Sequence, residues 1–328
     1  MPKKADAVFE GGGVKGIGLV GAVSEIEKAG YEFENLAGTS AGAIVAGLLA
    51  VGYTAAEIKE EMEKLDYNKF KDEGLLDKLG LLGKGITIGS SYGIYAGEYF
   101  ESWYDSLLGA KGKKTFGQIK TEYKDDKYKY KFQAIAADIS DRKLLVLPGD
   151  LSYFGFDPDQ FSIARAVRMS MSIPIFFEPV KLRDYSGVDH YIVDGGVLSN
   201  YPIWLLDDGT STPPWPTFGF KLVEPDQRVL KKGESNSIDS IASFLKAFAS
   251  TMMDAHDNYH ISNSKGDFDR TMAIPTVINL RGLDIEIKTT DFDITQEESQ
   301  ALFDNGAEVA RTFLKSWNFD TWVEKYRK

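Results

Sequence analysis

The sequence contains no cysteine and only three histidines among its 328 residues. Without cysteine the chain cannot build a disulfide framework, a thiolate metal site or a thiol nucleophile. The lack of disulfides favours a reducing compartment, although disulfide-free secreted proteins also exist. Histidine is the most frequent general base in enzymes. A chain with only His190, His256 and His260 therefore has few ways to build a histidine-based site.

A long hydrophobic run is also missing. Residues 1–13 hold no apolar stretch long enough for a signal peptide. The longest nearly uncharged stretch, Gly38–Ala56, is rich in Gly, Ala and Thr, whereas a membrane span needs roughly 20 strongly apolar residues. We predict a buried helix with its approach strand there, in a soluble, cytoplasmic protein. Peripheral attachment to a membrane and translocation as an effector are left open.

The charge balance is acidic, with 38 Lys and Arg against 49 Asp and Glu, a net charge of −11. Such a field disfavours nucleic acid as a partner and on average repels anionic membranes. The segment Lys111–Lys131 is basic instead, with eight lysines against three acidic residues. Its end, residues 127–132, alternates like a half-buried strand. This segment is either a solvated strand face or a docking edge for anionic lipid headgroups.

The first 65 residues read as strand, helix, strand, helix, helix. These elements span residues 5–10, 17–29, 33–38, 41–51 and 55–65. Strands that alternate with helices predict a mostly parallel sheet with helices packed against it.

Alternation and helical periodicity return after residue 130. Strands are predicted at 131–138, 143–147, 190–194, 218–223 and 277–280, and helices at 162–169, 238–261 and 297–317. Thr295 and Glu298 have the spacing of a capping box at the start of the last helix. The glycine- and leucine-rich residues 69–95 are interpreted as a cap or lid over a site, with an ordinary packed loop as the alternative.

The first candidate motif is the glycine loop GGGVKG, Gly11–Gly16, between a strand and a helix. Its spacing fits the dinucleotide fingerprint GxGxxG. A dinucleotide fold needs an acidic residue at the end of the second strand, but Gly38–Gly42 occupies that position. A P-loop needs a Lys-Ser or Lys-Thr pair, which is also missing. The loop is therefore not interpreted as a nucleotide site.

The second motif, GTSAG at Gly38–Gly42, has the GxSxG pattern of a nucleophile elbow. Ser40 would sit on a strained turn above the sheet, and Gly38 and Gly42 would allow strand and helix to approach closely. Backbone N–H groups and the positive end of the helix can then stabilise an oxyanion, each donor by roughly 3–4 kcal/mol. The candidate donors are Gly11, Gly12, Gly13 and Ala41, with Gly12 and Gly13 favoured.

The serine needs a base, and the histidines are poor candidates for it. His190 lies on a predicted strand and is interpreted as structural rather than as a triad member. His256 and His260 are spaced i, i+4 but lack the HExxH frame of a metal site, so a helix-surface pair is favoured. Asp194 ends a strand directly before Gly195 and Gly196. A buried carboxylate can act as the base if its pKa rises toward neutrality, which makes Ser40 and Asp194 a candidate dyad.

Four blocks in this order resemble the patatin-like phospholipase family. They are GGGVKG with Lys15 and Gly16, GTSAG with Ser40, RAVRMSMSIPIFF (Arg165–Phe177) with Ser170 and Pro174, and DGGVLSNYP (Asp194–Pro202) with Asp194, Gly195 and Gly196. Glu10, directly before the glycines, is a small departure from the family pattern.

The resemblance implies a three-layer α/β/α fold with a mostly parallel central sheet. It implies one catalytic domain over residues 1–328, with the motif blocks in 5–205 and residues 216–328 completing it. The implied activity is hydrolysis of carboxylic esters (EC 3.1.1) of phospholipids or other acyl lipids, of the phospholipase A or lysophospholipase type, through an acyl-serine intermediate. No metal or cofactor is implied.

The implied partners are the lipid substrate and, transiently, a membrane or micelle surface. An activating ligand or protein is left open. Two alternatives remain at this point: a soluble esterase or thioesterase for smaller acyl groups, and a lipid-binding module on an inactive hydrolase scaffold.

Overall fold

The computed structural model describes residues 2–65, 92–123, 125–207, 209, 212–223, 248, 266–289 and 291–327. Nearly all of the predicted lid at 69–95 and of the predicted helix at 238–261, with His256 and His260, lies outside these described residues.

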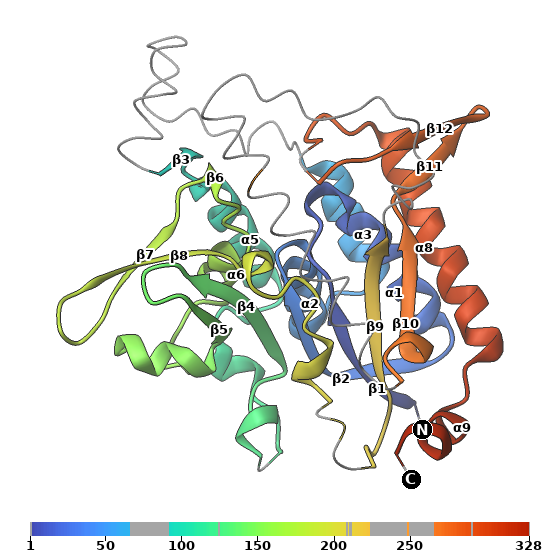
Figure 1. The fold of residues 1–328 in the computed structure, drawn as a ribbon, viewed down its shortest axis with the longest axis horizontal. Helices are drawn as coiled ribbons and strands as arrows, with labels where there is room; N and C mark the ends of the chain where they lie inside the picture. The colour runs from blue at the N-terminus through green and yellow to red at the C-terminus, as the bar shows by residue number, and fades with distance from the viewer. Residues whose placement is uncertain are drawn as a thin grey trace.

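Eight of the described strands form one mixed, mostly parallel sheet (Figure 1). Its order is β10-β9-β1-β2-β4-β8-β7, and β5 pairs with β4. The strands are β1 Lys3–Phe9, β2 Tyr31–Thr39, β4 Phe132–Asp138, β5 Lys143–Leu147, β7 Val180–Arg183, β8 Asp189–Asp194, β9 Thr217–Val223 and β10 Thr271–Pro275. The five strands from β10 to β4 pair in parallel, whereas β5, β8 and β7 pair antiparallel.

Helices and turns cover both faces of the sheet and give a three-layer α/β/α architecture. Alternate side chains of a strand point to opposite faces, and β1 follows this rule. Phe9 enters the larger core with the main helices, and Val8 enters a smaller core on the other face. The helices are α1 Gly16–Lys28, α2 Ala41–Val51, α3 Ala55–Lys64, α5 Glu98–Ala110, α6 Ile163–Ser170, α8 Gln296–Ser316 and α9 Phe319–Tyr326. The described second face is covered by the turns η7 Gly195–Val197 and η8 Ile203–Leu205 with their neighbours.

The predicted elements that fall within the described residues are confirmed to within two residues at each end. The capping box is also confirmed, because the Thr295 N–H donates to Glu298 Oε2 at 2.8 Å and the Glu298 N–H donates to Thr295 Oγ1 at 3.2 Å. The patterns did not predict α5, α9, β7 and β10, nor the pair β3 Gly93–Tyr95 with β6 Ile175–Phe177. They predicted β11 Val277–Leu280 but not its antiparallel partner β12 Leu283–Glu286.

One stretch of predicted strand is wrong. Residues 126–128 form a 3₁₀ turn, and β4 begins only at Phe132. The Asp125 carboxylate accepts the N–H of Lys127 at 2.9 Å, and the Asp125 carbonyl accepts the N–H of Tyr128 at 3.0 Å. These local bonds satisfy the backbone and so compete with pairing in the sheet.

Helices α1 and α8 pack so closely that the backbone of one lies against the backbone of the other. A Cβ on Gly306 of α8 would lie 1.9 Å from the Gly18 carbonyl oxygen, and one on Gly21 of α1 would lie 1.9 Å from the Phe303 carbonyl oxygen. Only glycine permits this approach. The last long helix is thereby held against the helix that follows the glycine loop.

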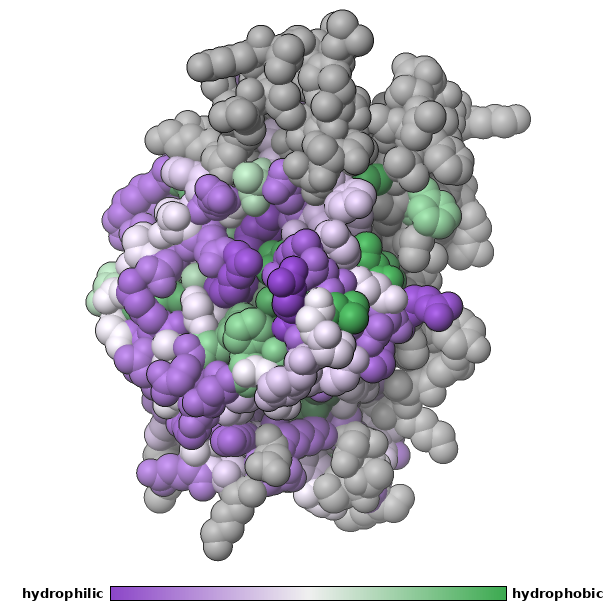
Figure 2. Space-filling model, turned by 90° about the vertical axis from the view of Figure 1, so that its left-hand side faces the viewer, coloured by the Kyte–Doolittle hydropathy of each residue, from purple (hydrophilic) through white to green (hydrophobic). Residues whose placement is uncertain are grey.

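The surface beside β7 and β8 is mainly hydrophilic where described residues cover it, and its hydrophobic areas are small and separate (Figure 2). Individual side chains such as Tyr185 and Val188 are exposed there. Scattered exposed apolar residues are normal on soluble proteins. None of the described helices is long and apolar enough to cross a membrane.

Candidate active site

Ser40 occupies a sharp turn between β2 and α2. Its backbone angles are φ 53° and ψ −123°, a region that costs a residue other than glycine about 1–3 kcal/mol. A Cβ on Gly38 would lie 2.4 Å from the Gly42 carbonyl, and one on Gly42 would lie 2.4 Å from the Phe9 carbonyl. The two glycines thus let strand and helix approach as the sequence predicts. Ser40 itself is buried, with 2% of its surface exposed.

The ends of two strands bring Ser40 and Asp194 together. Strand β5 occupies one edge of β4 from Ala134 to Asp138. Along the other edge, β4 pairs first with β2, up to the pair Thr39–Ile135, and then with β8, from the pair Asp194–Ala136. Strands β2 and β8 therefore run toward each other along the same edge and end at neighbouring positions. Ser40 follows one end, and Asp194 is the other.

Asp194 is fully buried. Its Oδ1 accepts the N–H of Gly196 at 2.7 Å, while Oδ2 has no hydrogen bond of normal geometry within the described residues. Burial raises the pKa of Asp194 to about 7, although the nearby Ser40 hydroxyl and the Gly196 N–H oppose the rise. Catalytic hydrogen bonds are often long or poorly aligned without substrate. The carboxylate thus keeps one acceptor atom beside the serine and has the basicity of a histidine.

The glycine loop lies against the elbow. A Cβ on Gly11 would lie 3.0 Å from Ser40 Cβ. The Gly11 N–H donates to the Asn200 carbonyl at 3.1 Å, which corrects its place among the candidate oxyanion donors. Within the described residues the N–H groups of Gly12, Gly13 and Ala41 have no acceptor.

Two helix N-termini face this region. Gly16 begins α1, and a Cβ there would lie 3.1 Å from the Cβ of Ala41, the first residue of α2. Each helix carries about half a positive charge at its N-terminus, which favours a negative group. Lys15, on the preceding turn, is buried.

The other predicted motif residues surround the junction of the strands. Ser170 Oγ accepts the N–H of Ser40 at 3.0 Å. A Cβ on Gly195 would lie 2.3 Å from the Ile135 carbonyl oxygen, so glycine is required where the chain leaves β8. Pro174 lies in the turn between α6 and β6.

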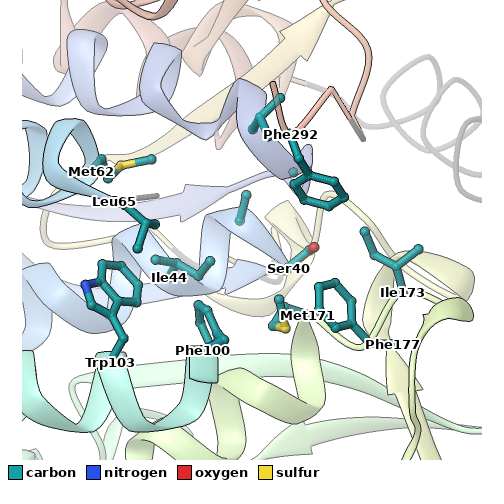
Figure 3. Close-up of a pocket in the computed structure, with 13 residues that line it drawn as sticks. Ser40, Ile44, Met62, Leu65, Phe100, Trp103, Met171, Ile173, Phe177 and Phe292 are labelled. Carbon is teal, nitrogen blue, oxygen red and sulfur yellow. The ribbon is translucent and has the colours of Figure 1, made fainter. Parts of the chain in front are cut away.

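An apolar pocket with a cavity volume of about 50 Å³, partly open to solvent, lies beside Ser40 (Figure 3). Among the described residues that line it, Ser40 is the only one with a hydroxyl, carboxylate, amide or cationic side chain. The lining comprises Gly13, Val14, Ser40, Ala41, Ile44, Met62, Leu65, Phe100, Trp103, Met171, Ile173, Phe177 and Phe292. From Ser40 the pocket follows α2 past Ile44 toward Met62, Leu65 and Trp103 (Figure 3).

Sequence reasoning missed the pocket wall and the contribution of the C-terminal third. Phe100 and Trp103 lie on α5, where apolar residues recur every three or four positions and could have indicated the helix. Phe292 and Thr289 come from the end of the chain. The Thr289 carbonyl accepts the Val14 N–H at 3.2 Å and would lie 2.0 Å from a Cβ on Gly13. No local sequence pattern can predict a contact between residues so far apart in the chain.

His190 lies away from Ser40, near the beginning of β8. Its Nδ1 is 2.7 Å from Asp138 Oδ2, and both residues are buried, so the structural interpretation is confirmed. These two residues and Asp141 are the one group of potential metal ligands found in the described part of the chain. The direct hydrogen bond between His190 and Asp138 accounts for their proximity.

Glu10, the departure from the family pattern, is also structural. Its carboxylate binds Lys221 Nζ at 2.5 Å and accepts the N–H of Leu222. Both partners belong to β9. This buried pair ties the start of the glycine loop to the neighbouring strand.

The fold and the site together define a class: three-layer α/β/α proteins with a GxSxG elbow, a DGG strand end and an apolar pocket beside the elbow. The chain belongs to the patatin-like phospholipase family, whose sequence profile matches residues 7–207.

Individual relatives agree with this assignment. The chain is 37% identical to the protein YqhO of Bacillus subtilis, over 96% of this chain and 99% of that protein. It is 26% identical to the "probable lipid hydrolase 463L" of Invertebrate iridescent virus 6, over 60% of this chain and 61% of that protein.

Solved structures share the fold. VipD from Legionella pneumophila aligns with a TM-score of 0.55 at 20% identity, over 96% of this chain and 67% of that one. The type III effector protein ExoU aligns with a TM-score of 0.50 at 17% identity, over 96% of this chain. The present chain spans about half of ExoU, 53% of its length.

Proposed function

We propose that the protein is a lipid acyl hydrolase that cleaves carboxylic esters with Ser40 as nucleophile and Asp194 as general base. One observation carries the proposal. A strained, buried serine opens into an apolar pocket beside a buried carboxylate whose pKa is raised to about 7. A binding module would need the pocket but not this pairing of nucleophile and base.

In the first half of the reaction, Asp194 Oδ2 takes the proton of the Ser40 hydroxyl as Oγ attacks the acyl carbonyl carbon. The carbonyl oxygen becomes an oxyanion that accepts hydrogen bonds from Gly12, Gly13 and Ala41. Collapse of this intermediate breaks the ester bond, and Asp194 returns the proton to the departing alcohol.

In the second half, Asp194 takes a proton from water, which attacks the acyl-serine. A second oxyanion forms in the same place and collapses to release the fatty acid, and Ser40 regains its proton. No metal or cofactor takes part in either half.

The apolar lining of the pocket supports the proposal that the protein recognises the acyl chain of its substrate. The described residues of its lining offer hydrocarbon and aromatic side chains along α2 and no charged side chain for a phosphate. The viral relative, a probable lipid hydrolase by name, supports the same substrate class. We therefore propose activity of the phospholipase A or lysophospholipase type, by a cytoplasmic protein that contacts a membrane or micelle transiently.

The contacts of the lysine-rich segment 111–131 give little support to the hypothesis that it binds lipid headgroups and delivers substrate to this site. Lys111 binds Glu57 at 2.7 Å, Lys114 binds Asp105 at 2.5 Å, and Lys120 pairs with Asp159. The segment leads into the beginning of β4, whereas Ser40 follows the opposite end of the parallel neighbour β2. The solvated-face interpretation fits these contacts better than lipid docking.

The test is covalent labelling with a fluorophosphonate lipid analogue, followed by peptide mapping. We expect one adduct on Ser40, and we expect Ser40→Ala and Asp194→Asn each to lower ester turnover at least 1,000-fold while the variants stay folded. Ser24→Ala and Asp6→Asn replace a buried serine and a buried aspartate away from the pocket and serve as matched controls. A folded Asp194→Asn variant with near-normal turnover would refute the dyad.

A further inference from the structure

The junction between β2 and β8 is a weak point in the sheet. Both strands end against β4 at the neighbouring positions Ile135 and Ala136, and the chain turns away at Ser40 and at Gly195. The partner strand of β4 therefore changes from β2 to β8 at the point where Ser40 and Asp194 must be held in register, and each of the two strands ends there. Reactive geometry is sensitive here, since a displacement of about 1 Å can cost 100-fold in rate.

The end of α6 supplies hydrogen bonds to both sides of this junction. On one side, Ser170 Oγ donates to the Ile135 carbonyl at 2.6 Å and accepts the N–H of Ser40 at 3.0 Å. A serine hydroxyl has a single proton. Because that proton goes to Ile135, the oxygen presents a lone pair to Ser40, and both bonds have a fixed direction.

On the other side, the Ser172 carbonyl accepts the N–H of Asp194 at 2.9 Å. Ser170 and Ser172, which are two positions apart in the chain, thus hold the backbone of the proposed nucleophile and of the proposed base. Both Ser170 and Ser172 are fully buried, so water does not compete for these bonds.

A buried arginine fixes the turn itself. Ser172 Oγ donates to the Arg168 carbonyl at 2.6 Å and accepts a hydrogen bond from the Arg168 guanidinium. The same guanidinium donates to the carbonyls of Ala96 at 2.6 Å and Glu178 at 2.8 Å. It also lies 5.5 Å from the ring centre of Phe177, which lines the pocket.

We propose that Ser170 and Ser172 are positioning residues that set the separation of Ser40 and Asp194, and that Arg168 holds their turn in place. The proposal rests on the proposed function, because it concerns the same two residues. Neither serine touches the reacting atoms. Their hydrogen bonds act on the backbone of Ser40 and Asp194, so we expect their main effect on the rate of the chemical step.

The experiment compares the full-length protein with Ser170→Ala, Ser170→Thr and the control Ser24→Ala, using a soluble acyl ester. Ser24 is a buried helical serine whose hydroxyl bonds only locally, to the Gly21 carbonyl at 2.7 Å. We expect Ser170→Ala to lower kcat about 100-fold with little change in KM. Ser170→Thr keeps the hydroxyl and should recover about tenfold of that loss. The fluorophosphonate labelling rate at Ser40 should fall in parallel with kcat.

Unfolding is monitored by circular dichroism, and Ser172→Ala provides a second variant if Ser170→Ala does not fold. Ser172→Ala keeps the carbonyl but loses the contact with Arg168, and a fall in kcat without a rise in KM is expected. A folded Ser170→Ala variant with normal kcat, or one whose defect lies in KM alone, overturns the positioning role and leaves the proposed function intact. Absence of both turnover and labelling in the unsubstituted protein overturns the proposed function instead.

Discussion

At the scale of single residues, the base that we propose is a buried carboxylate rather than a histidine. An exposed aspartate has a pKa near 3.9 and is a weak base at neutral pH. Complete burial raises the pKa of Asp194 to about 7, which is close to the value at which general bases work best in the cell. The same burial leaves Oδ2 without a competing donor among the described residues. The environment of the carboxylate, more than its identity, would make it catalytic.

This environment predicts the pH dependence of the reaction. Asp194 must be ionised to accept the Ser40 proton, so kcat/KM should rise with pH, reach half its maximum near pH 7 and level off above pH 8. This pH dependence can be measured as kcat/KM for hydrolysis of a soluble ester between pH 5 and 9. The alkaline plateau should be lost in Asp194→Asn. Full activity maintained down to pH 5 would contradict a buried carboxylate as the base.

The sequence motifs include the proposed nucleophile and base and also Ser170, but they do not single out Ser172. Ser40, Asp194 and the glycines sit in short motifs with fixed spacing, because a strand–turn–helix elbow is a local structure. Ser172 contributes a carbonyl oxygen to Asp194, and every residue type has one. No side-chain pattern could mark that role. Gly11 shows the converse, since its motif position did not reveal that Asn200 already accepts its N–H.

At the scale of elements, the same helices build the core and the substrate pocket. Helices α2, α3 and α5 contribute Ile44, Met62, Phe100 and Trp103 to the lining, and Leu65 follows directly after α3. Their apolar spacing is that of ordinary core helices. Periodicity could therefore predict α2 and α3 as helices, but it could not tell which of their buried faces borders a cavity. That distinction depends on how the helices are placed around Ser40.

The placement of Trp103 predicts selectivity for acyl-chain length. Trp103 lies away from Ser40 along the pocket, opposite Ile44 and beside Leu65 (Figure 3). Trp103→Ala should shift the preferred ester toward longer chains, with a roughly tenfold change in the long-to-short ratio of kcat/KM. A series of p-nitrophenyl esters measures this ratio. Trp215→Ala, outside the pocket, is the control, and an unchanged profile in Trp103→Ala would place the acyl chain elsewhere.

At the scale of the whole molecule, the C-terminal third completes structure that the family motifs begin. Strands β9 and β10 extend the sheet beside β1. Helix α8 packs on α1 through Gly306, and Thr289 and Phe292 reach the glycine loop and the pocket. These contacts support a single catalytic domain over the chain, although the family profile covers only residues 7–207.

A fragment limited to residues 1–207 should therefore fail to fold. It would leave β1 as an open sheet edge and would expose the face of α1 that α8 covers, including Gly18 and Gly21. We expect aggregation on expression and no labelling of Ser40 by fluorophosphonate. Circular dichroism and labelling of the purified fragment measure this. A fragment that folds cooperatively and labels at the rate of the full chain would show that the last third is dispensable.

The contact between Thr289 and the glycine loop also bears on how the protein is made. Ribosomes deliver a chain from its N-terminus, so the elbow at Ser40 emerges long before Thr289 and Phe292. Until those residues arrive, the loop lacks its partner carbonyl and the pocket lacks one wall. We therefore expect Ser40 to stay unreactive toward a fluorophosphonate until residues 289–292 have left the ribosome.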